Sequence, residues 1–375
     1  MLVALVALLA ASAWLPITVG RGQVATPPPL AQAFGVPSGA QKATARRRDD
    51  DLQLYDTAIA RIRQGENYYS FIIAAHRKAQ YPVRPSVAVR LPTLAYLDAW
   101  AGSQGQIAAA IGLMLGVLYA WWQRLGSEAG GPQHRNFAMA MLLVSSALGL
   151  NRTFFVLHEL WAGMLIALSF GLHRPAGRGA PHGGRWLGAW CAAALALAIR
   201  EHTLPFVLLM GAYAGWRRAG REAAAWLAMA GLFAIGLAVH IHLIAAQTLP
   251  SDPVGASWLA CRGLGGWLSD IVLSSNLRML PHWLAGPLVM LMILGWAGWR
   301  SAAGSFATLL YLGYGVLFMI AGRDDNFYWG AMIAPTMFIG LAFVPMAVRG
   351  LIRSALMNEP CDDVSIRPAD LDLGA

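Results

Sequence analysis

Charged residues are scarce in this sequence. Only 13% of its 375 residues are Asp, Glu, Lys or Arg, whereas 57% are hydrophobic. A soluble domain usually has about 25% charged residues. Several segments also approach the roughly 20 apolar residues that are needed to cross a bilayer. The scarcity of charge therefore excludes an ordinary soluble domain and predicts a polytopic membrane protein.

Cysteine is equally sparse, and the common cofactor motifs are missing. Cys191, Cys261 and Cys361 are predicted to lie in a membrane helix, an outer loop and the inner tail, too far apart for a disulfide or a shared metal. The sequence has no Gly-rich phosphate-cradling loop and no basic-aromatic motif of a nucleic-acid reader. We therefore expect no nucleotide cofactor and, despite the net charge of +9, no nucleic-acid partner. Asp49, Asp50 and Asp51, with Asp324 or Asp325, could supply oxygen ligands for a divalent ion. Three consecutive acids on one helix point in different directions, so we expect no obligatory metal.

The apolar segments predict an all-α bundle of about ten transmembrane helices, with eight to eleven as the range because several are short. They are residues 2–19, 105–122, 136–151, 153–172, 186–199, 203–216, 223–245, 281–299, 303–321 and 328–348. The predicted organisation is a first transmembrane helix at 1–19, an extracytoplasmic loop at 20–104, a bundle at 105–348 and a tail at 349–375. No Lys or Arg precedes the first helix, so we expect a retained anchor, although Ala11-Ser12-Ala13 resembles a cleavage site.

The distribution of arginines among the connections predicts the orientation in the membrane. The count uses the connections after residue 104. If Met1 is inside, most arginines of these connections lie on the inner side, and the outer ones carry only Arg152, Arg200, Arg262, Arg278 and Arg323. Positive charge favours the cytoplasmic side, so both termini are predicted to be cytoplasmic and the loop 20–104 to lie outside.

The long outer loop is predicted to contain interfacial helices. Leu52, Tyr55, Ile59 and Ile62 form one apolar stripe between Asp50 and Arg63. A second helical pattern ends near residue 79, and the mixed segment 87–100 leads into the bundle as an interfacial helix.

Ionisable residues also recur near the predicted outer ends of the membrane helices. They are His158 with Glu159, Arg200 with Glu201 and His202, and Arg323 with Asp324, Asp325 and Asn326. Such groups are costly inside a membrane and tend to face a cavity or a partner. An outer cavity with cations and acids suits a lipid phosphate and a sugar, because guanidinium groups bind phosphate oxygens and a carboxylate can accept the proton of an attacking hydroxyl.

Asp51-Leu52-Gln53-Leu54-Tyr55, directly after the first membrane helix, resembles the acidic motif of the integral-membrane GT-C class of glycosyltransferases. Gly65-Glu66-Asn67-Tyr68-Tyr69, Tyr81-Pro82 and Arg90-Leu91-Pro92 are also similar to segments of bacterial members. The likeness covers the topology of most of the chain, but the motif is short. Many members have a second acid beside or after the motif acid, whereas here Leu52 follows and Asp49 and Asp50 precede.

The resemblance implies an inverting sugar transfer from a polyprenyl-phosphate-linked donor at the outer face of a bacterial inner membrane. The acceptor would be a hydroxyl of a glycan, lipid or protein of the cell envelope, and the enzyme a hexosyltransferase such as a mannosyltransferase. Asp51 would be the general base, with Asp50 as the other candidate. We expect Tyr55, Arg84 and Arg90 to contact substrate together with Glu159, His158, Arg200, His202, Arg323 and Asn326.

Each of these residues also has a structural interpretation. Asp49 to Asp51 could cap a helix, Glu159 and His158 could be a satisfied buried pair, and Arg200 and Arg323 could anchor at the membrane surface. The alternative functions are a transporter or lipid flippase, and a non-catalytic assembly protein of the envelope.

Overall fold

The computed structural model describes residues 2–19, 23–24, 50–175 and 184–356 of the chain. Helices dominate this part, and the described strands are the two-residue pair β1 (Thr18–Val19) and β2 (Gln23–Val24). Four helical segments are long and apolar enough to cross a membrane: Ser86–Ser127, Gly220–Ala245, Ala302–Ile320 and Ala334–Leu356. Five shorter apolar helices accompany them. The chain is thus a helical membrane protein, and the count of ten crossings stays a prediction.

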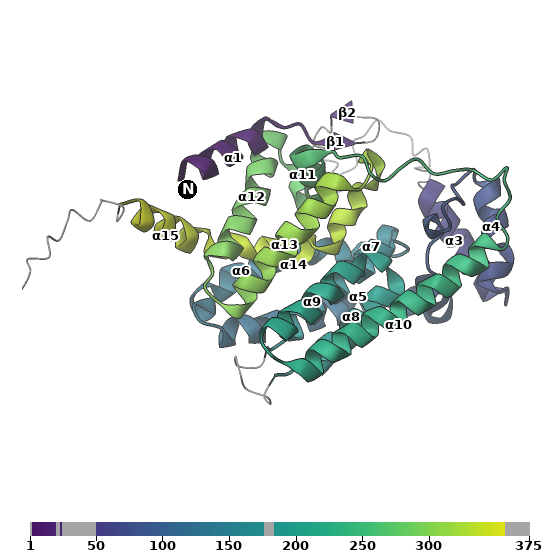
Figure 1. Cartoon of the computed structure of the whole chain (residues 1–375), viewed down its shortest axis with the longest axis horizontal. Helices are drawn as coiled ribbons and strands as arrows, with labels where there is room; N and C mark the ends of the chain where they lie inside the picture. Colours follow the sequence, from purple (N-terminus) through teal and green to yellow (C-terminus); the bar gives the residue numbers. More distant parts are fainter. Residues whose placement is uncertain (1, 20–22, 25–49, 176–183, 357–375) are drawn as a thin grey trace, which may run out of the picture.

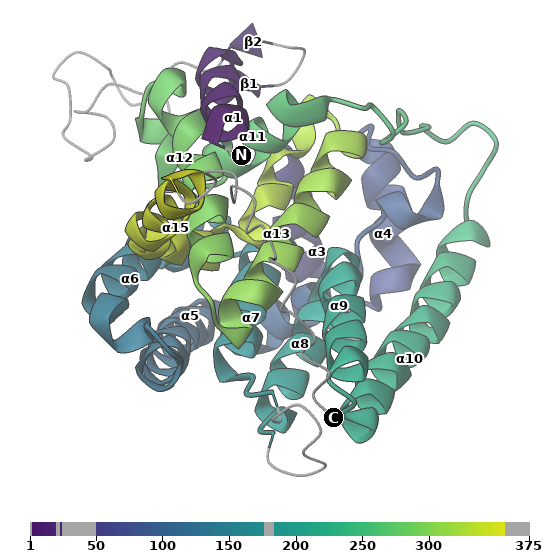
Figure 2. The same cartoon turned by 60° about the vertical axis from the view of Figure 1, so that its left-hand side comes forward.

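The bundle is built from helices that follow the predicted apolar segments closely (Figure 1). They are α1 (Leu2–Trp14), α5 (Thr93–Ser127), α6 (Gly131–Ser146), α7 (His158–Leu172), α8 (Leu187–Ile199), α9 (Leu204–Trp216), α10 (Gly220–Ala245), α12 (His282–Gly298) and α13 (Ala302–Ile320). Figure 2 shows α10 at the edge of the bundle beside α9. Its side chains Leu227, Leu232 and Ile235 are exposed, as expected of a helix that contacts lipid.

The outer segment contains the predicted short helices. They are α3 (Asp50–Arg63), α4 (Tyr68–Lys78) and the 3₁₀ turn η1 (Ser86–Ala88). A separate apolar cluster, which includes Phe71, Ile72 and Val83, holds them together. The predicted loop before Asp50, with Asp49, and the predicted tail from residue 357, with Cys361, lie outside the described residues.

Gly102 kinks the long helix α5. Its backbone angles are φ 64° and ψ −179° inside an otherwise helical segment, a combination that is essentially restricted to glycine. The sequence predicts an interfacial helix that ends near Trp100 and a crossing from 105, and Gly102 lies between these two predicted segments. The kink lets one continuous helix run along the outer segment and then enter the bundle.

Replacement of Gly102 by Ala should therefore strain the kink. No atom lies within 4 Å of an added Cβ, so the cost comes from the backbone angles alone. We expect Gly102→Ala to lower the free energy of unfolding by about 1–3 kcal/mol. Gly112, an α5 glycine with the same open space and no such kink, is the control: Gly112→Ala should be neutral or stabilising in the same denaturation assay. Equal effects at the two positions would contradict the explanation.

The last predicted crossing, 328–348, is broken into short pieces. They are η6 (Asp324–Met332), α14 (Ala334–Met337), η7 (Phe338–Phe343) and α15 (Val344–Leu356). Most side chains from Trp329 to Phe343 are buried. A Cβ on Gly340 would lie 2.0 Å from the carbonyl oxygen of Met292, so glycine allows the backbone to approach α12 closely. Protein, rather than lipid, therefore surrounds much of this segment.

One buried helix was not predicted. Helix α11 (Gly263–Leu273) lies within the expected outer loop 246–280, and residues 266–272 are all buried. It is followed by the turn η5 (Asn276–Met279) and packs against α13 and η6. Residues 246–262, which we call the strap, run from the end of α10 past α4 and across to α11 (Figure 1).

The predicted outer connections gather at one end of the bundle, and the predicted inner ones at the other. At the outer end lie α3, η1, the turn η4 (Glu201–Thr203), the strap and η6, all of which line one cavity. At the other end, the amide of Ala303 donates to Glu128 at 2.8 Å. His173 and Glu222 likewise pair there at 2.7 Å. The structure therefore separates these two groups of connections, and the side of the membrane that each group faces stays a prediction.

Candidate functional site

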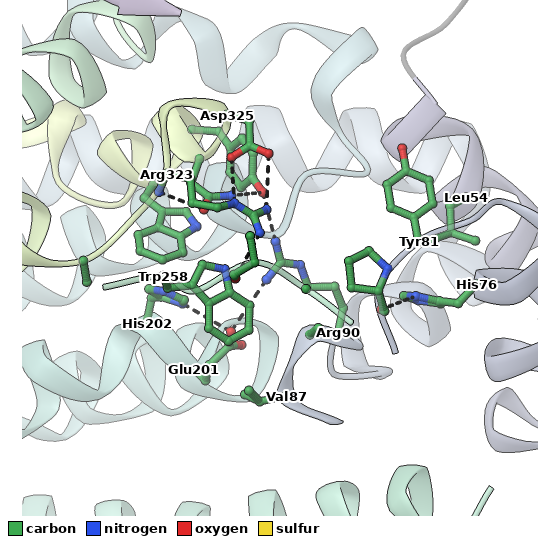
Figure 3. Close-up of a pocket in the computed structure, with 18 of the residues that line it drawn as sticks. Leu54, His76, Tyr81, Val87, Arg90, Glu201, His202, Trp258, Arg323 and Asp325 are labelled. Atoms are coloured by element: carbon green, nitrogen blue, oxygen red, sulfur yellow. Dashed lines mark hydrogen bonds and ion pairs between the residues drawn. The ribbon is translucent and has the colours of Figure 1, made fainter. Parts of the chain in front are cut away.

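A cavity of about 990 Å³ lies at the end of the bundle that the sequence predicts to be outer. Its polar lining includes Arg90, Glu201, Arg323, Asp324 and Asp325, which come from segments far apart in the sequence. Figure 3 shows Glu201, His202 and Arg323 on one side of Arg90, and Leu54, His76 and Tyr81 on the other. We call this space the Arg90 cavity.

The aromatic lining comes from four places in the chain. Tyr55 belongs to α3, Tyr81 follows α4, Trp258 lies in the strap, and Tyr328 and Trp329 belong to η6. Aromatic faces and a few charged groups are the usual lining of a small-molecule site. The cavity is large enough for a ligand bigger than one sugar ring, since ligand pockets usually span about 300–1,000 Å³.

Beneath the cavity, Arg90, Glu159, Arg200 and Glu201 form a buried ion-pair cluster. Arg200 is fully buried, and its Nε lies 2.7 Å from Oε1 of Glu159, whose side chain is only 2% exposed. Arg200 also pairs through Nη1 with Oε1 of Glu201. Arg90 lies 3.7 Å from an oxygen of each glutamate. Arg200 therefore neutralises both carboxylates at close range, and Arg90 completes a set of two cations and two anions.

Arg90 is the cation of this cluster that faces the cavity. Its Nε donates to the hydroxyl of Tyr55 at 3.2 Å, and its Nη2 donates to the hydroxyl of Tyr328 at 3.3 Å. These two tyrosines hold the guanidinium plane between α3 and η6. Because the contacts of Arg90 with carboxylates are longer than hydrogen bonds, its remaining donors are the most available of the cluster to an anionic ligand.

Glu201 and His202 form the base of the cavity on η4. Burial alone would raise the pKa of Glu201, but Arg200, His202 and Arg90 outweigh it and lower the pKa well below the ordinary value. Burial and the charge of Arg200 lower the pKa of His202. His202 also packs against Trp329, with ring centroids 4.3 Å apart. At neutral pH, the base of the cavity is therefore an ionised carboxylate beside a neutral imidazole.

His158 lies behind the cavity rather than in its lining. Its ring meets Tyr55 edge-on at 5.2 Å, and neither ring nitrogen has a hydrogen-bond partner. It borders a second space of about 20 Å³, which Asp98 of α5 also lines. A space of this size holds one water molecule. The sequence did not single out Asp98, although an acid among the apolar residues before Gly102 was an available signal.

The rim of the cavity is a second set of paired charges. Arg323 binds Asp325 through Nε at 3.0 Å and Nη2 at 3.2 Å. Asn326 accepts a hydrogen bond from the amide of Arg323 at 3.2 Å. Its own side-chain amide donates to Tyr328 at 3.1 Å. Asn326 thus fixes the turn that presents both Arg323 and Tyr328.

Arg262 ties this rim to α11. Its Nη2 contacts both oxygens of the fully buried Asp270, at 2.8 and 2.9 Å. Its Nε donates to the carbonyl of Gly322 at 3.0 Å. The sequence placed Arg262 and Asp270 in an outer loop without a role, because the pairing depends on helix α11 being packed inside the protein.

Arg84 binds the strap and does not line the Arg90 cavity. Its Nη2 donates to the carbonyls of Pro250 and Asp252, at 2.7 and 3.2 Å. Asp252 in turn accepts from Nε and Nη2 of Arg77, at 2.5 and 2.9 Å. These contacts join the strap to the α4 segment, so Arg84 positions the strap that carries Trp258 to the cavity.

The Arg77–Asp252 pair should make stability depend on pH. Hydrogen bonds from Arg77 and from the amide of Leu249 lower the pKa of Asp252 from 3.8 to about 2. Because the pKa is lower in the folded state, the pair stabilises fully above about pH 4, and this stabilisation is lost as the pH falls toward 2. We expect Asp252→Asn to have a lower thermal midpoint than wild type at neutral pH. Between pH 5 and about 3, the midpoint of the variant should fall less than that of wild type. If the two midpoints, measured in detergent, fall in parallel with pH, the pair does not have this role.

The two candidate bases lie at the start of α3. The helix begins at Asp50, so Asp51 occupies the position one turn before Leu54 and Tyr55, both of which line the cavity. Residues four apart share a helix face. The side chains of Asp50 and Asp51 lie outside the described part of the chain. Within the described part, no three His, Cys, Asp or Glu residues cluster as metal ligands would.

The structure brings most of the predicted site residues together. Tyr55, Arg90, His202, Arg323 and Asn326 line the cavity. Glu159 and Arg200 lie beneath it in the buried cluster, while Arg84 binds the strap. Trp258 is a lining residue that the sequence did not indicate, because nothing in the strap predicts which of its side chains turns inward.

No protein-family model matches this chain, and neither a curated protein nor a solved structure matches it. The residues of the site and the short motif at Asp51 are therefore the features that indicate a function.

Proposed function

We propose that the protein is a membrane glycosyltransferase of the GT-C kind. It would move a hexose, such as mannose, from a polyprenyl-phosphate-linked donor to an acceptor hydroxyl on a glycan, lipid or protein. The bundle would cross a bacterial inner membrane about ten times, with both termini in the cytoplasm and the Arg90 cavity facing the periplasm. Neither a metal nor another cofactor is expected.

The observation that carries the proposal is the position of Arg90. It lies at the inner wall of a large aromatic-lined cavity, and its partly uncommitted guanidinium can bind the oxygens of a donor phosphodiester. Arg200 already holds Glu159 and Glu201, so a phosphate can approach Arg90 without leaving either buried carboxylate unpaired. Arg323 is a second cation on the rim, where its partner Asp325 is exposed to solvent.

The proposed reaction is a single displacement. The acceptor oxygen attacks the anomeric carbon, the bond from that carbon to the phosphate oxygen breaks, and the proton of the acceptor hydroxyl passes to the carboxylate of Asp51. Polyprenyl phosphate leaves with the bonding electron pair, and its charge is stabilised by Arg90. One displacement inverts the anomeric configuration. Tyr55, on the same helix face as Asp51, supports Arg90, so α3 would couple the base to the phosphate site.

A transporter or lipid flippase is the main alternative, and an envelope assembly protein is another. Transporter sites usually lie near the middle of the membrane, whereas the charged residues of the Arg90 cavity gather at one end of the bundle. That placement favours the transferase.

The test is a transfer assay with the purified chain in liposomes. A set of polyprenyl-phosphate-linked hexoses would be supplied with candidate acceptors, and the release of polyprenyl phosphate and the anomeric configuration of the product would be measured. We expect release with inversion, and a raised KM in Arg90→Gln. Movement of the intact donor between leaflets without release of polyprenyl phosphate would favour the flippase instead.

A further inference from the structure

A second cavity, of about 720 Å³, lies at the opposite end of the bundle from the Arg90 cavity. It is formed by the second half of α5, the end of α7 and the start of α8, and its polar lining includes Gln123, Arg174 and Arg185. Glu159 of the buried ion-pair cluster begins α7 and Arg174 follows its other end, so the length of that helix separates the two cavities. This end carries the connections that were predicted to be cytoplasmic.

The two arginines of this cavity are directly paired through their backbones. The amide of Arg174 donates to the carbonyl of Arg185 at 2.9 Å, and the amide of Arg185 donates back at 3.0 Å. The bridge is antiparallel. Residues opposite each other in such a pair carry their side chains on the same face. The bridge therefore holds two like charges side by side, an arrangement that is unfavourable unless something neutralises them.

The charges in the described part of the chain do not neutralise this pair. Neither Arg174 nor Arg185 has a carboxylate within 4.0 Å among the described residues. The side chain of Arg174 donates instead to the carbonyls of Gly171 and His173, at 2.6 and 3.1 Å. Burial and the charges of Arg124 and Arg185 lower the pKa of Arg174 to about 10, so it remains a cation at neutral pH.

The acids described at this end of the bundle are already committed, although the charge of Glu128 raises the pKa of Arg174 and so offsets part of the lowering. Glu128 binds Nε of Arg124 and the amide of Ala303, both at 2.8 Å. Glu222 binds His173 at 2.7 Å. In the Arg90 cavity every described arginine is matched by a carboxylate, whereas this cavity carries an excess of positive charge.

Apolar and aromatic side chains border the same cavity. Tyr119 and Leu187 are each 64% exposed, and Trp186 is half-buried. Exposed aromatic and aliphatic groups beside cations are typical of the level of lipid headgroups. Basic pockets between transmembrane helices on the cytoplasmic side bind anionic headgroups.

We propose that Arg174 and Arg185 form a binding site for a phosphate-bearing anion, supplied by an anionic phospholipid of the leaflet at this end of the bundle. The phosphate would lie between the two guanidinium groups, and the acyl chains would run along Tyr119 and Leu187. This site is separate from the Arg90 cavity and does not depend on the proposed transfer reaction.

The experiment measures binding of phosphatidylglycerol to the full-length protein in mixed micelles, with phosphatidylcholine and inorganic phosphate as parallel probes. We expect phosphatidylglycerol to bind and to raise the thermal midpoint, and the double variant Arg174→Gln/Arg185→Gln to bind it roughly twentyfold more weakly. If a phospholipid supplies the phosphate, inorganic phosphate should raise the thermal midpoint little. If inorganic phosphate raises it as much as phosphatidylglycerol does, the two arginines still form an anion site, but its ligand is a soluble phosphate.

The matched control is Arg221→Gln/Arg300→Gln. Both residues are exposed and lie on the same predicted side of the membrane, but neither lines this cavity. The control removes the same charge, so it should keep most of the phosphatidylglycerol binding. If both double variants lose binding equally, the effect is general surface attraction and the site is refuted. Failure of phosphatidylglycerol and inorganic phosphate to bind the wild-type protein would refute it as well.

Discussion

Asp51→Asn should reduce sugar transfer by about a hundred- to ten-thousandfold, the usual contribution of a general base. The substitution keeps the size of the side chain and its ability to cap a helix, but an amide cannot accept the proton of the acceptor hydroxyl. The yield of folded protein and donor binding should therefore persist, because Arg90 and its tyrosine partners are untouched. The measurement is the rate of polyprenyl phosphate release at saturating donor.

Asp50→Asn is the matched control for this prediction. The two residues are adjacent at the start of α3, and each substitution removes one negative charge from the same helix end. Successive positions on a helix lie about 100° apart, so we expect only one of the two residues to act on a given acceptor. Loss of activity in Asp50→Asn alone would transfer the role of base to that residue. Full activity in both variants would leave these acids with a capping role only.

Arg200→Met should cause the largest loss of stability. The variant would leave Glu159 buried with Arg90 3.7 Å away as its remaining ion partner, and Glu201 would lose its closest cation. Removing one partner of a buried ion pair usually costs about 3–5 kcal/mol. The free energy of unfolding, measured by denaturant titration in detergent, should fall by that amount. Arg300→Met, at an exposed arginine, should change it by less than about 0.5 kcal/mol.

A double variant separates the ion pair from simple packing. Glu159→Gln removes the charge that Arg200 neutralises, so Arg200→Met/Glu159→Gln should be less destabilised than the sum of the two single variants. Strict additivity would show that the short Arg200–Glu159 distance has no energetic consequence. In that case Arg200 would stabilise the protein only through the contacts of its apolar stem.

Much of the helical framework was predictable because apolar runs report directly on membrane helices. The segments around α7, α8, α9 and α13 were placed within a few residues, and the Gly102 kink coincides with the predicted change from interface to bundle. The broken segment after Asp324 and helix α11 were not predicted. Their conformations depend on close backbone contacts, such as that of Gly340 with Met292, which no local pattern reveals.

The sequence predicted most residues of the site, but not how deeply each is buried or what it contacts. The predicted topology placed Tyr55, Arg90, His202 and Arg323 on one side of the membrane, and in the structure these four residues line one cavity. The sequence could not rank Arg90 above Arg200, because their difference lies in which carboxylate each contacts and at what distance. Arg84 was also predicted to contact substrate, yet its partners are carbonyls of the strap.

The even match of two guanidiniums and two carboxylates around Arg90 has a consequence for donor choice. A pocket floor with no surplus of either sign can accept a carrier that bears one phosphodiester charge, but a diphosphate-linked carrier would bring additional negative charge close to Glu201. Like charges at such range are repulsive in a partly dry site. Polyprenyl monophosphate should therefore compete with the donor far better than polyprenyl diphosphate, and equal inhibition by the two would indicate that cations elsewhere on the rim supply the missing compensation.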